Sequence, residues 1–302
     1  MIPPAGHHGG DGLAVARALG IDPATVVDLS MSLNPFAPDV AAIAARHTDA
    51  VRWYPDVTAA TASLAEALGV ERERVALTNG GSEAIALVAR AVGGTVAGEP
   101  EFSLHPRGPS GPIWRSNPHN PTGSLAADDD RVDVWDEAFY PLAAGAWTRG
   151  DPDTVVVGSL TKLFACPGLR LGYVLADDVP RYTDGQPAWP LNGIALAVLP
   201  ELLVSADLVG WREAIAARRA ELVLLLTEHG FTVAAGDAPW VLVVAPGLRE
   251  RLAPLAVVVR DCASFGLDGW VRIAVPDDAG MRRLADALDR VAVPQRGPGD
   301  TR

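Results

Sequence analysis

Residues 158–173 read Gly158-Ser-Leu-Thr-Lys162-Leu-Phe-Ala-Cys-Pro-Gly-Leu-Arg170-Leu-Gly-Tyr173, and Lys162 is the only lysine in the chain, beside 24 arginines. Where arginine fills nearly every cationic position, a remaining lysine suggests chemistry that arginine cannot perform, such as losing a proton or forming a Schiff base. One interpretation is an exposed loop lysine. The other is a lysine bonded to a phosphate-bearing aldehyde, with Ser159 and Arg170 holding the phosphate.

Composition and charge exclude several classes of protein. The chain has 302 residues and is 49% hydrophobic, so it can bury a sizeable core and is not mainly disordered. A formal net charge of −12 makes it a poor partner for nucleic acid. Its two cysteines, Cys166 and Cys262, cannot form a disulfide framework and fit a reducing compartment. The N-terminus shows no signal-peptide pattern and no run of about 18 apolar residues occurs, so we expect a cytoplasmic protein without a membrane span.

Apolar stretches predict an α/β architecture up to about residue 200. A helix is expected over 82–91, and the first 45 residues are rich in loops. Strands are expected at 75–78, 132–135, 155–157 and 171–176. The near-continuous apolar character of these strands is typical of a mostly parallel sheet with helices on both faces.

The remainder of the chain predicts a smaller α+β domain. Helices are expected over 207–228 and 279–291, with strands at 240–244, 256–259 and 270–275. The expected organisation is an N-terminal segment at 1–45, a large domain at 46–200, a small domain at 201–293 and a disordered tail at 294–302.

Three further motifs carry candidate chemistry. Asp136 ends an apolar strand, where ligands of α/β sheets bind, although a helix-capping role is equally open. Residues 116–123 form a double-proline turn that presents two amides, including Asn120. Gly80 and Gly81 lie between a strand and a helix start, whose N–H groups bind anions, but glycine-rich turns are common.

Together with residues 158–173, these segments resemble, in this order, the fold-type-I pyridoxal-phosphate enzymes of the class I/II aminotransferase family. The resemblance implies that Lys162 bonds to the cofactor and later moves protons, and that Asp136 keeps the pyridine nitrogen protonated. It implies that Asn120 forms a hydrogen bond with the ring O3′ and that Phe102 stacks on the ring. His105 is the alternative stacking residue, or a partner of Asp136. The phosphate would be held by Ser159, Arg170 and the amides around Gly81 and Ser82, with Gly80 and Thr161 as further cofactor-binding residues. No metal is implied.

The resemblance also implies a substrate site and a homodimer. Arg272 matches the arginine that binds the substrate carboxylate, and Tyr54 matches a tyrosine that reaches the neighbouring subunit's phosphate. Segments around His8, Asn34 and Arg260 resemble those of threonine-phosphate decarboxylases of cobalamin synthesis, which indicates a second anion site. A flexible terminal histidine is the alternative for His8, and a surface arginine for Arg272. Asn120 is also a candidate substrate ligand.

The chain departs from the family in two respects. Phe139 stands where many members carry a tyrosine, and the segments 92–118 and 123–136 are short. The expected function is decarboxylation of L-threonine O-3-phosphate or a similar phosphorylated amino acid. The first alternative is an aminotransferase of the histidinol-phosphate type, acting on a phosphorylated amine. The second is a catalytically silent relative that binds the cofactor.

Overall fold

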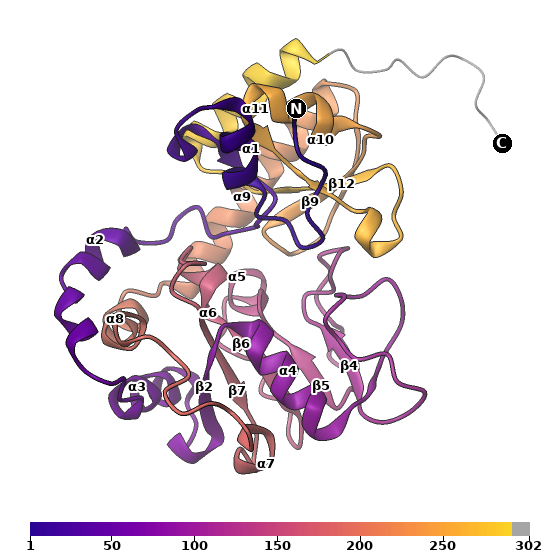
Figure 1. The fold of residues 1–302 in the computed structure, drawn as a ribbon. Coiled ribbons are helices and arrows are strands. Elements are labelled where there is room, and N and C mark those ends of the chain that lie inside the picture. Colours follow the sequence, from indigo (N-terminus) through magenta and orange to yellow (C-terminus); the bar gives the residue numbers. More distant parts are fainter. Residues whose placement is uncertain (292–302) are drawn as a thin grey trace. The chain divides into compact units, whose positions relative to one another are not determined.

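The computed structural model describes residues 1–291, so the tail expected at 294–302 lies outside the described residues. The chain separates into two compact units (Figure 1). The larger unit comprises Leu33–Ala217 with Gly236–Pro239, and the smaller comprises Met1–Ser32, Arg218–Ala235 and the chain from Trp240 on. The N-terminal segment of the smaller unit therefore ends at 32 rather than 45. The later border falls at 217 rather than 200, inside the continuous helix α9 (Leu208–Glu228).

The larger unit is built on a six-stranded sheet in the order β2-β7-β6-β5-β4-β3. All strands run in one direction except β7, which is antiparallel to β2 and β6. The strands are β2 (Val75–Asn79), β3 (Thr95–Val96), β4 (Ile113–Ser116), β5 (Val134–Asp136), β6 (Val155–Ser159) and β7 (Leu171–Leu175). Its helices are α2 (Val40–Ala45), α3 (Thr58–Leu68), α4 (Gly81–Val92), α5 (Tyr140–Ala144), α6 (Leu160–Leu163), α7 (Pro180–Thr183) and α8 (Gly193–Val204).

The strands of this sheet are buried on both faces, as their apolar composition predicts. Val134, Val157 and Val174 pack into one cluster with the apolar face of α4, which crosses the sheet in Figure 1. Trp135 and Tyr173 alternate with these residues, point to the other face and are also buried. The carboxyl ends of β5 and β6 form one edge of this sheet, where the polar side chains of Asp136 and Ser159 are buried.

The short segment between Gly123 and β5 has no helix, and Arg149 holds it in place. The Arg149 guanidinium donates to the carbonyls of residues 126, 127, 128 and 130, and it pairs with Asp151. It also lies 5.0 Å from the centre of the Trp135 ring. One planar cation with five donors thus replaces the hydrogen bonds that a helix would make within itself.

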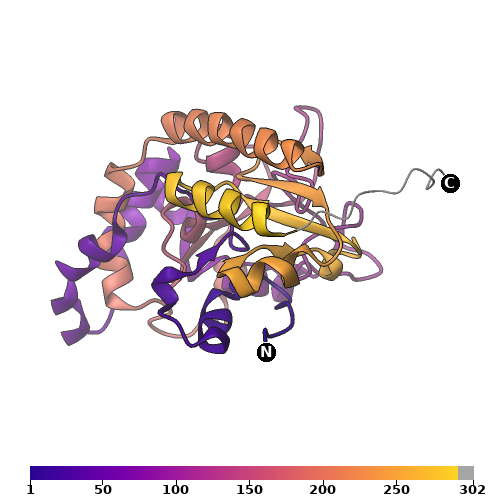
Figure 2. The ribbon, with the colours of Figure 1, turned by 90° about the horizontal axis from the view of Figure 1, so that it is seen from above.

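The smaller unit contains a four-stranded antiparallel sheet in the order β11-β12-β9-β8 and a separate parallel pair, β1 with β10. Its helix α11 lies beside the second part of α9 in both views (Figures 1 and 2), joined by the pairs Arg218–Asp278 and His229–Asp289. The strands are β1 (Val27–Asp28), β8 (Thr232–Ala235), β9 (Trp240–Val244), β10 (Val257–Val258), β11 (Arg260–Asp261) and β12 (Trp270–Ala274). The helices wholly within this unit are α1 (Gly12–Leu19), α10 (Leu248–Leu252) and α11 (Asp278–Arg290).

Two details differ from the sequence-based expectation. The first 45 residues, expected to be rich in loops, also include α1 and α2, since Val15 and Ile43 each supply a buried face. The strand expected at 256–259 is shorter, β10 (Val257–Val258), and a separate strand, β11 (Arg260–Asp261), follows it and pairs with a different partner. Within residues 1–291, α8 and α9 meet the length and apolarity of a membrane span only when joined across an 84° bend, and no single helix does. The cytoplasmic location remains a prediction.

The role of Arg149 leads to a stability prediction. Arg149→Met should lower the free energy of unfolding by about 2–4 kcal/mol, because it removes a largely buried ion pair with Asp151 and leaves the half-buried carbonyl of Ala126 without its donor. Chemical denaturation monitored by tryptophan fluorescence measures this loss. Arg131→Met is the matched control, since Arg131 donates to the carbonyls of Asp128 and Asp130 from an exposed position, and it should change stability by only about 0.5 kcal/mol. Equal losses in both variants would contradict the assignment.

Candidate active site

A glycine-lined cradle forms where β7 passes the start of α4. Gly80 has a φ of +78°, and a Cβ on Gly172 of β7 would lie 2.4 Å from the carbonyl carbon of Gly80. A Cβ on Gly81 would lie 3.1 Å from that of Ser159. Only glycines at these positions let the two elements meet, which brings the first N–H groups of α4, and hence Ser82, beside the end of β6.

Ser159 and Arg170 complete this cradle with side-chain donors. A Cβ on Gly80 would meet the Arg170 guanidinium at 2.4 Å, so the cation lies directly over the glycine turn. Arg170 has a φ of +60° and donates to the carbonyls of Pro167 and Asn79, at 3.2 and 3.5 Å. The Ser159 hydroxyl is 2.8 Å from that of Thr161. Backbone amides, two hydroxyls and a guanidinium around a space that a Cβ would fill suit a phosphate group.

Lys162 lies in α6, the short helix directly after β6. Its amine is 5.8 Å from the centre of the buried Phe139 ring. Asn34 holds the backbone here, because its amide N–H donates to the carbonyl of Lys162 and its side chain donates to that of Leu163. The Asn34 side-chain oxygen accepts from Phe36. Asn34, predicted as a substrate ligand, is therefore placed by the structure as a support of the lysine segment.

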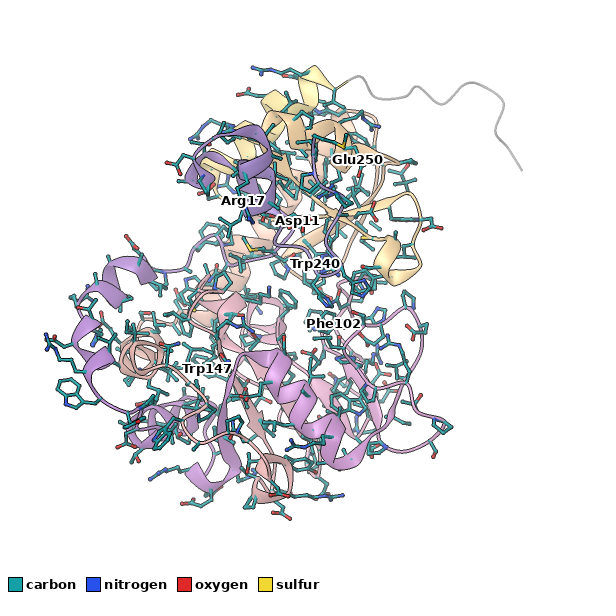
Figure 3. The ribbon with its side chains drawn as sticks, in the orientation of Figure 1. Asp11, Arg17, Phe102, Trp147, Trp240 and Glu250 are labelled. Carbon is teal, nitrogen blue, oxygen red and sulfur yellow. The ribbon has the colours of Figure 1, made fainter. Side chains whose placement is uncertain are left out.

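Asp136 ends β5 at the same edge of the sheet. It is buried, its Oδ1 accepts from the amide of Ala138 at 3.0 Å, and its Oδ2 lies 3.0 Å from Nε2 of His105. Phe102 meets the His105 ring edge to face, from the loop between β3 and β4 (Figure 3). The structure thus makes His105 the partner of Asp136, while Phe102 is the aromatic side chain beside that pair.

Two further buried polar residues, Asn120 and Glu137, lie in the segments that follow β4 and β5. Asn120 is buried in the proline-rich turn. Glu137 follows Asp136, and burial raises the pKa of its carboxyl to about 7. The amide of Arg149 donates to Glu137. This hydrogen bond connects the end of β5 to Arg149, the residue that holds the segment between Gly123 and β5. Among residues 1–291, no group of three or more His, Cys, Asp or Glu side chains is arranged to hold a metal ion.

The remaining predicted ligands lie in the smaller unit, where two buried arginines face each other. Arg260 of β11 and Arg272 of β12 are register partners in the antiparallel pair. Burial, and then the charge of Arg260, lowers the pKa of Arg272 to about 9. Like charges in opposite positions destabilise a sheet, so this arrangement favours a bound anion.

Arg260 also organises the N-terminal segment that carries His8. Its guanidinium donates to the carbonyls of His8 and His7 at 2.6 and 3.1 Å. Burial and the neighbouring His7 and Arg260 lower the pKa of His8. Arg249, which sequence reasoning missed, is fully buried and donates to the carbonyls of Pro3 and Pro4 and to Asp11, which precedes α1 (Figure 3). A single arginine with a partner 238 residues away leaves no local sequence signal.

The family model described as Aminotransferase class I and II matches residues 104–288 of the chain. The chain belongs to this family. Histidinol-phosphate aminotransferase 1 from Dechloromonas aromatica is 25% identical, with 91% of this chain and 92% of the relative covered. A threonine-phosphate decarboxylase from Sinorhizobium sp is 32% identical over 58% of each chain. The residue range matched by the family model therefore includes Asp136, Lys162 and Arg272.

Solved structures show the same fold. Histidinol-phosphate aminotransferase from Sinorhizobium meliloti, in complex with pyridoxal-5′-phosphate, superposes with a TM-score of 0.78 at 17% identity, covering 92% of this chain and 94% of that one. L-threonine-O-3-phosphate decarboxylase from Porphyromonas gingivalis gives a TM-score of 0.72 at 20% identity, covering 88% and 99%. The comparisons confirm the predicted family, the α/β fold class, an enzyme and pyridoxal-phosphate dependence.

The comparisons also bear on the short segments. The alignment with the Dechloromonas aromatica relative spans 342 positions, whereas the present chain has 302 residues. At least 40 positions of that alignment therefore have no residue in this chain. This chain forms the cradle and the buried sheet edge without them.

The cradle yields a prediction about anion binding. Gly80→Ala should weaken pyridoxal-phosphate binding by about 10-fold or more, because its Cβ would displace the Arg170 guanidinium. Fluorescence titration with pyridoxal phosphate measures this change. Gly93→Ala is the matched control: its φ of +62° and ψ of −142°, like the +78° and 167° of Gly80, lie in a region of backbone conformation essentially restricted to glycine, but nothing lies within 4 Å of its Cβ. Unchanged affinity in Gly80→Ala would contradict the placement of the phosphate.

Proposed function

We propose that the larger unit holds pyridoxal phosphate at the buried edge of its sheet formed by the carboxyl ends of β5 and β6. Ser159, Thr161, Arg170 and the amides of Gly81 and Ser82 would bind the phosphate. Asp136 would pair with the pyridine nitrogen, Phe102 would stack on the ring, and Asn120 would bond O3′. The observation that carries this proposal is the convergence of the glycine cradle and a buried carboxylate on one edge that also carries the only lysine. When bound, this cofactor accepts the electron pair of a bond broken at the substrate Cα.

The residues of this chain would supply binding and proton transfer. Lys162 is the proposed covalent anchor and the group that donates or removes a proton at Cα. Asp136, buried and fixed by two hydrogen bonds, would stabilise positive charge at the ring nitrogen because an ionised carboxylate beside a cation keeps it protonated. Phe139 has no hydroxyl, so it excludes water beside Lys162 without donating a proton to O3′.

The favoured reaction is decarboxylation of L-threonine O-3-phosphate, or a similar phosphorylated amino acid, to the aminopropanol phosphate of cobalamin assembly. The bond between Cα and the carboxylate breaks, carbon dioxide leaves, and a proton from Lys162 adds to Cα. The paired arginines Arg260 and Arg272 support a substrate with two anionic groups. Threonine phosphate carries both a carboxylate and a phosphate. Arg272 is the proposed carboxylate ligand, with Arg260 and His8 toward the phosphate.

The second candidate is an aminotransferase of the histidinol-phosphate type. It is favoured by relatives of that name that cover nine tenths of the chain. Histidinol phosphate has one anionic group, so the arginine pair would then serve the two carboxylates of an amino-acid partner as well. A catalytically silent relative that retains cofactor binding is the third candidate, favoured by the missing positions. The intact set of Lys162, Asp136 and Arg272 argues against it.

We also propose a homodimer in which Tyr54 reaches the phosphate bound by the neighbouring subunit. Tyr54 is 76% exposed and stacks on Trp189, which is 57% exposed, with ring centres 4.3 Å apart. Trp53 and Val51, nearby in the sequence, are also exposed. Large exposed apolar side chains in one region are typical of a protein interface.

The reaction itself is testable with three substrates. We expect carbon dioxide from threonine phosphate without a keto acid, slower release from phosphoserine by about 10-fold or more because it lacks a methyl group, and little glutamate from histidinol phosphate with 2-oxoglutarate. Lys162→Ala is the negative control, and borohydride should fix the cofactor on Lys162 in the parent protein. Ready formation of glutamate without carbon dioxide would establish the aminotransferase. Cofactor fixation without any turnover would establish the silent relative.

Arg272 provides a test that separates stability from binding. Arg272→Met should raise the unfolding temperature of the substrate-free protein, because it removes a desolvated charge opposite Arg260. The same change should lower kcat/KM by about 100-fold or more, since the carboxylate loses a charged donor. Arg282→Met, at an exposed position of α11, should change neither quantity appreciably. Parent-like kcat/KM in Arg272→Met would contradict its role as the carboxylate ligand.

A further inference from the structure

A buried row of three titratable side chains ends at Asp136, and only its last two members were expected from the sequence. His105 has no exposed side-chain surface and stands between two buried carboxylates. Its Nε2 is 3.0 Å from Asp136 Oδ2, and its Nδ1 is 3.8 Å from Glu101 Oε1. Glu101 immediately precedes Phe102 and plays no part in the proposed chemistry so far.

The contacts of Glu101 favour its ionised form. Oε2 accepts from the amide of Ser116 at 2.8 Å, and Oε1 accepts from the Ser116 hydroxyl at 2.6 Å and from the amide of Phe102 at 2.7 Å. Three donors on a buried carboxylate stabilise the negative charge. Glu101 therefore presents a fixed anion to the ring of His105.

The protonation of His105 follows from its two neighbours. An ionised Asp136 only accepts hydrogen bonds, so the contact at Nε2 requires a proton on that nitrogen. Nδ1 is buried and has no hydrogen-bond partner among the described residues. A bare Nδ1 would direct its lone pair toward the Glu101 carboxylate and leave two uncompensated negative charges in the row. A protonated Nδ1 lies within ion-pair distance of Glu101 and reduces the net charge of the row to −1.

We propose that Glu101 is a positioning residue that keeps both ring nitrogens of His105 protonated, and that it thereby holds Asp136 ionised and oriented. This inference rests on the proposed role of Asp136 toward the pyridine nitrogen. The remaining charge of −1 would be balanced by a protonated pyridine ring. Through its bond to the amide of Phe102, the same carboxylate also fixes the backbone of the proposed stacking residue.

The test reads the ring nitrogens of His105 by ¹⁵N NMR on the full chain labelled at histidine, near neutral pH, before and after addition of pyridoxal phosphate. The chain has six histidines, and the signals of His105 are those lost in His105→Asn. We expect both nitrogens at the shifts of a doubly protonated ring in the parent protein. In Glu101→Gln, which keeps the shape and an acceptor for Ser116, Nδ1 should move to the shift of a bare nitrogen.

Glu99→Gln is the matched control. Glu99 is a carboxylate two residues away that pairs with Arg107 and accepts from the amide of Glu101 at 2.8 Å; glutamine keeps an acceptor for that amide, so removal of the Glu99 charge should leave both His105 signals unchanged. A purely structural role for Glu101 would also leave them unchanged in Glu101→Gln, and that result overturns the proposal. A bare Nδ1 in the parent protein overturns it without recourse to any variant.

The measurement before cofactor addition separates this inference from the proposed function. If pyridoxal phosphate fails to bind while His105 is doubly protonated only in the presence of Glu101, the cofactor role of Asp136 is wrong and the Glu101 assignment stands. If the cofactor binds to a protein whose His105 has a bare Nδ1, the Glu101 assignment is wrong and the cofactor site stands.

Discussion

The close contact between β7 and the turn before α4 is the constraint on which the cofactor site depends. Gly172 and Gly80 approach so closely that neither position can carry a Cβ without moving backbone or the Arg170 guanidinium. Because this contact fixes the start of α4 against the ends of β6 and β7, backbone donors and side-chain donors surround one small space. Backbone donors cost no side-chain entropy to order, which suits such a cradle to the proposed phosphate even in a strongly acidic chain.

Single arginines hold several loops of this chain by making many hydrogen bonds to backbone carbonyls. Arg149 holds the segment before β5, and Arg249 and Arg260 hold the N-terminal segment. A guanidinium suits this task because its five donors lie in one plane and stay charged. The composition, with 24 arginines and one lysine, is consistent with this use of arginine as a structural cation.

The main groups of buried charged side chains in the two units differ in sign. In the larger unit, the carboxylates of Glu101 and Asp136 lie on either side of His105, and the row carries excess negative charge. In the smaller unit, the buried side chains of Arg260 and Arg272 occupy opposite positions of β11 and β12. Burying charge is costly to a folded protein. In the proposed function, each group of buried charges meets a ligand of opposite sign: a protonated ring in the first case and a substrate anion in the second.

The sequence by itself determined the family and the strands β2, β5, β6 and β7, and it predicted the residues that we propose to bear the chemistry, because each lies in a local motif whose composition dictates its conformation. The glycines of 80–81 require a turn, apolar runs require a buried sheet, and a single lysine is visible by counting. The tertiary structure alone decided which of these residues have partners. Asn34 supports the lysine segment, the N-terminal segment of the smaller unit ends at 32, and Glu101 faces His105 because β4 brings Ser116 to its carboxylate. Such long-range hydrogen bonds depend on the register and closure of distant strands, and no local pattern of residues encodes them.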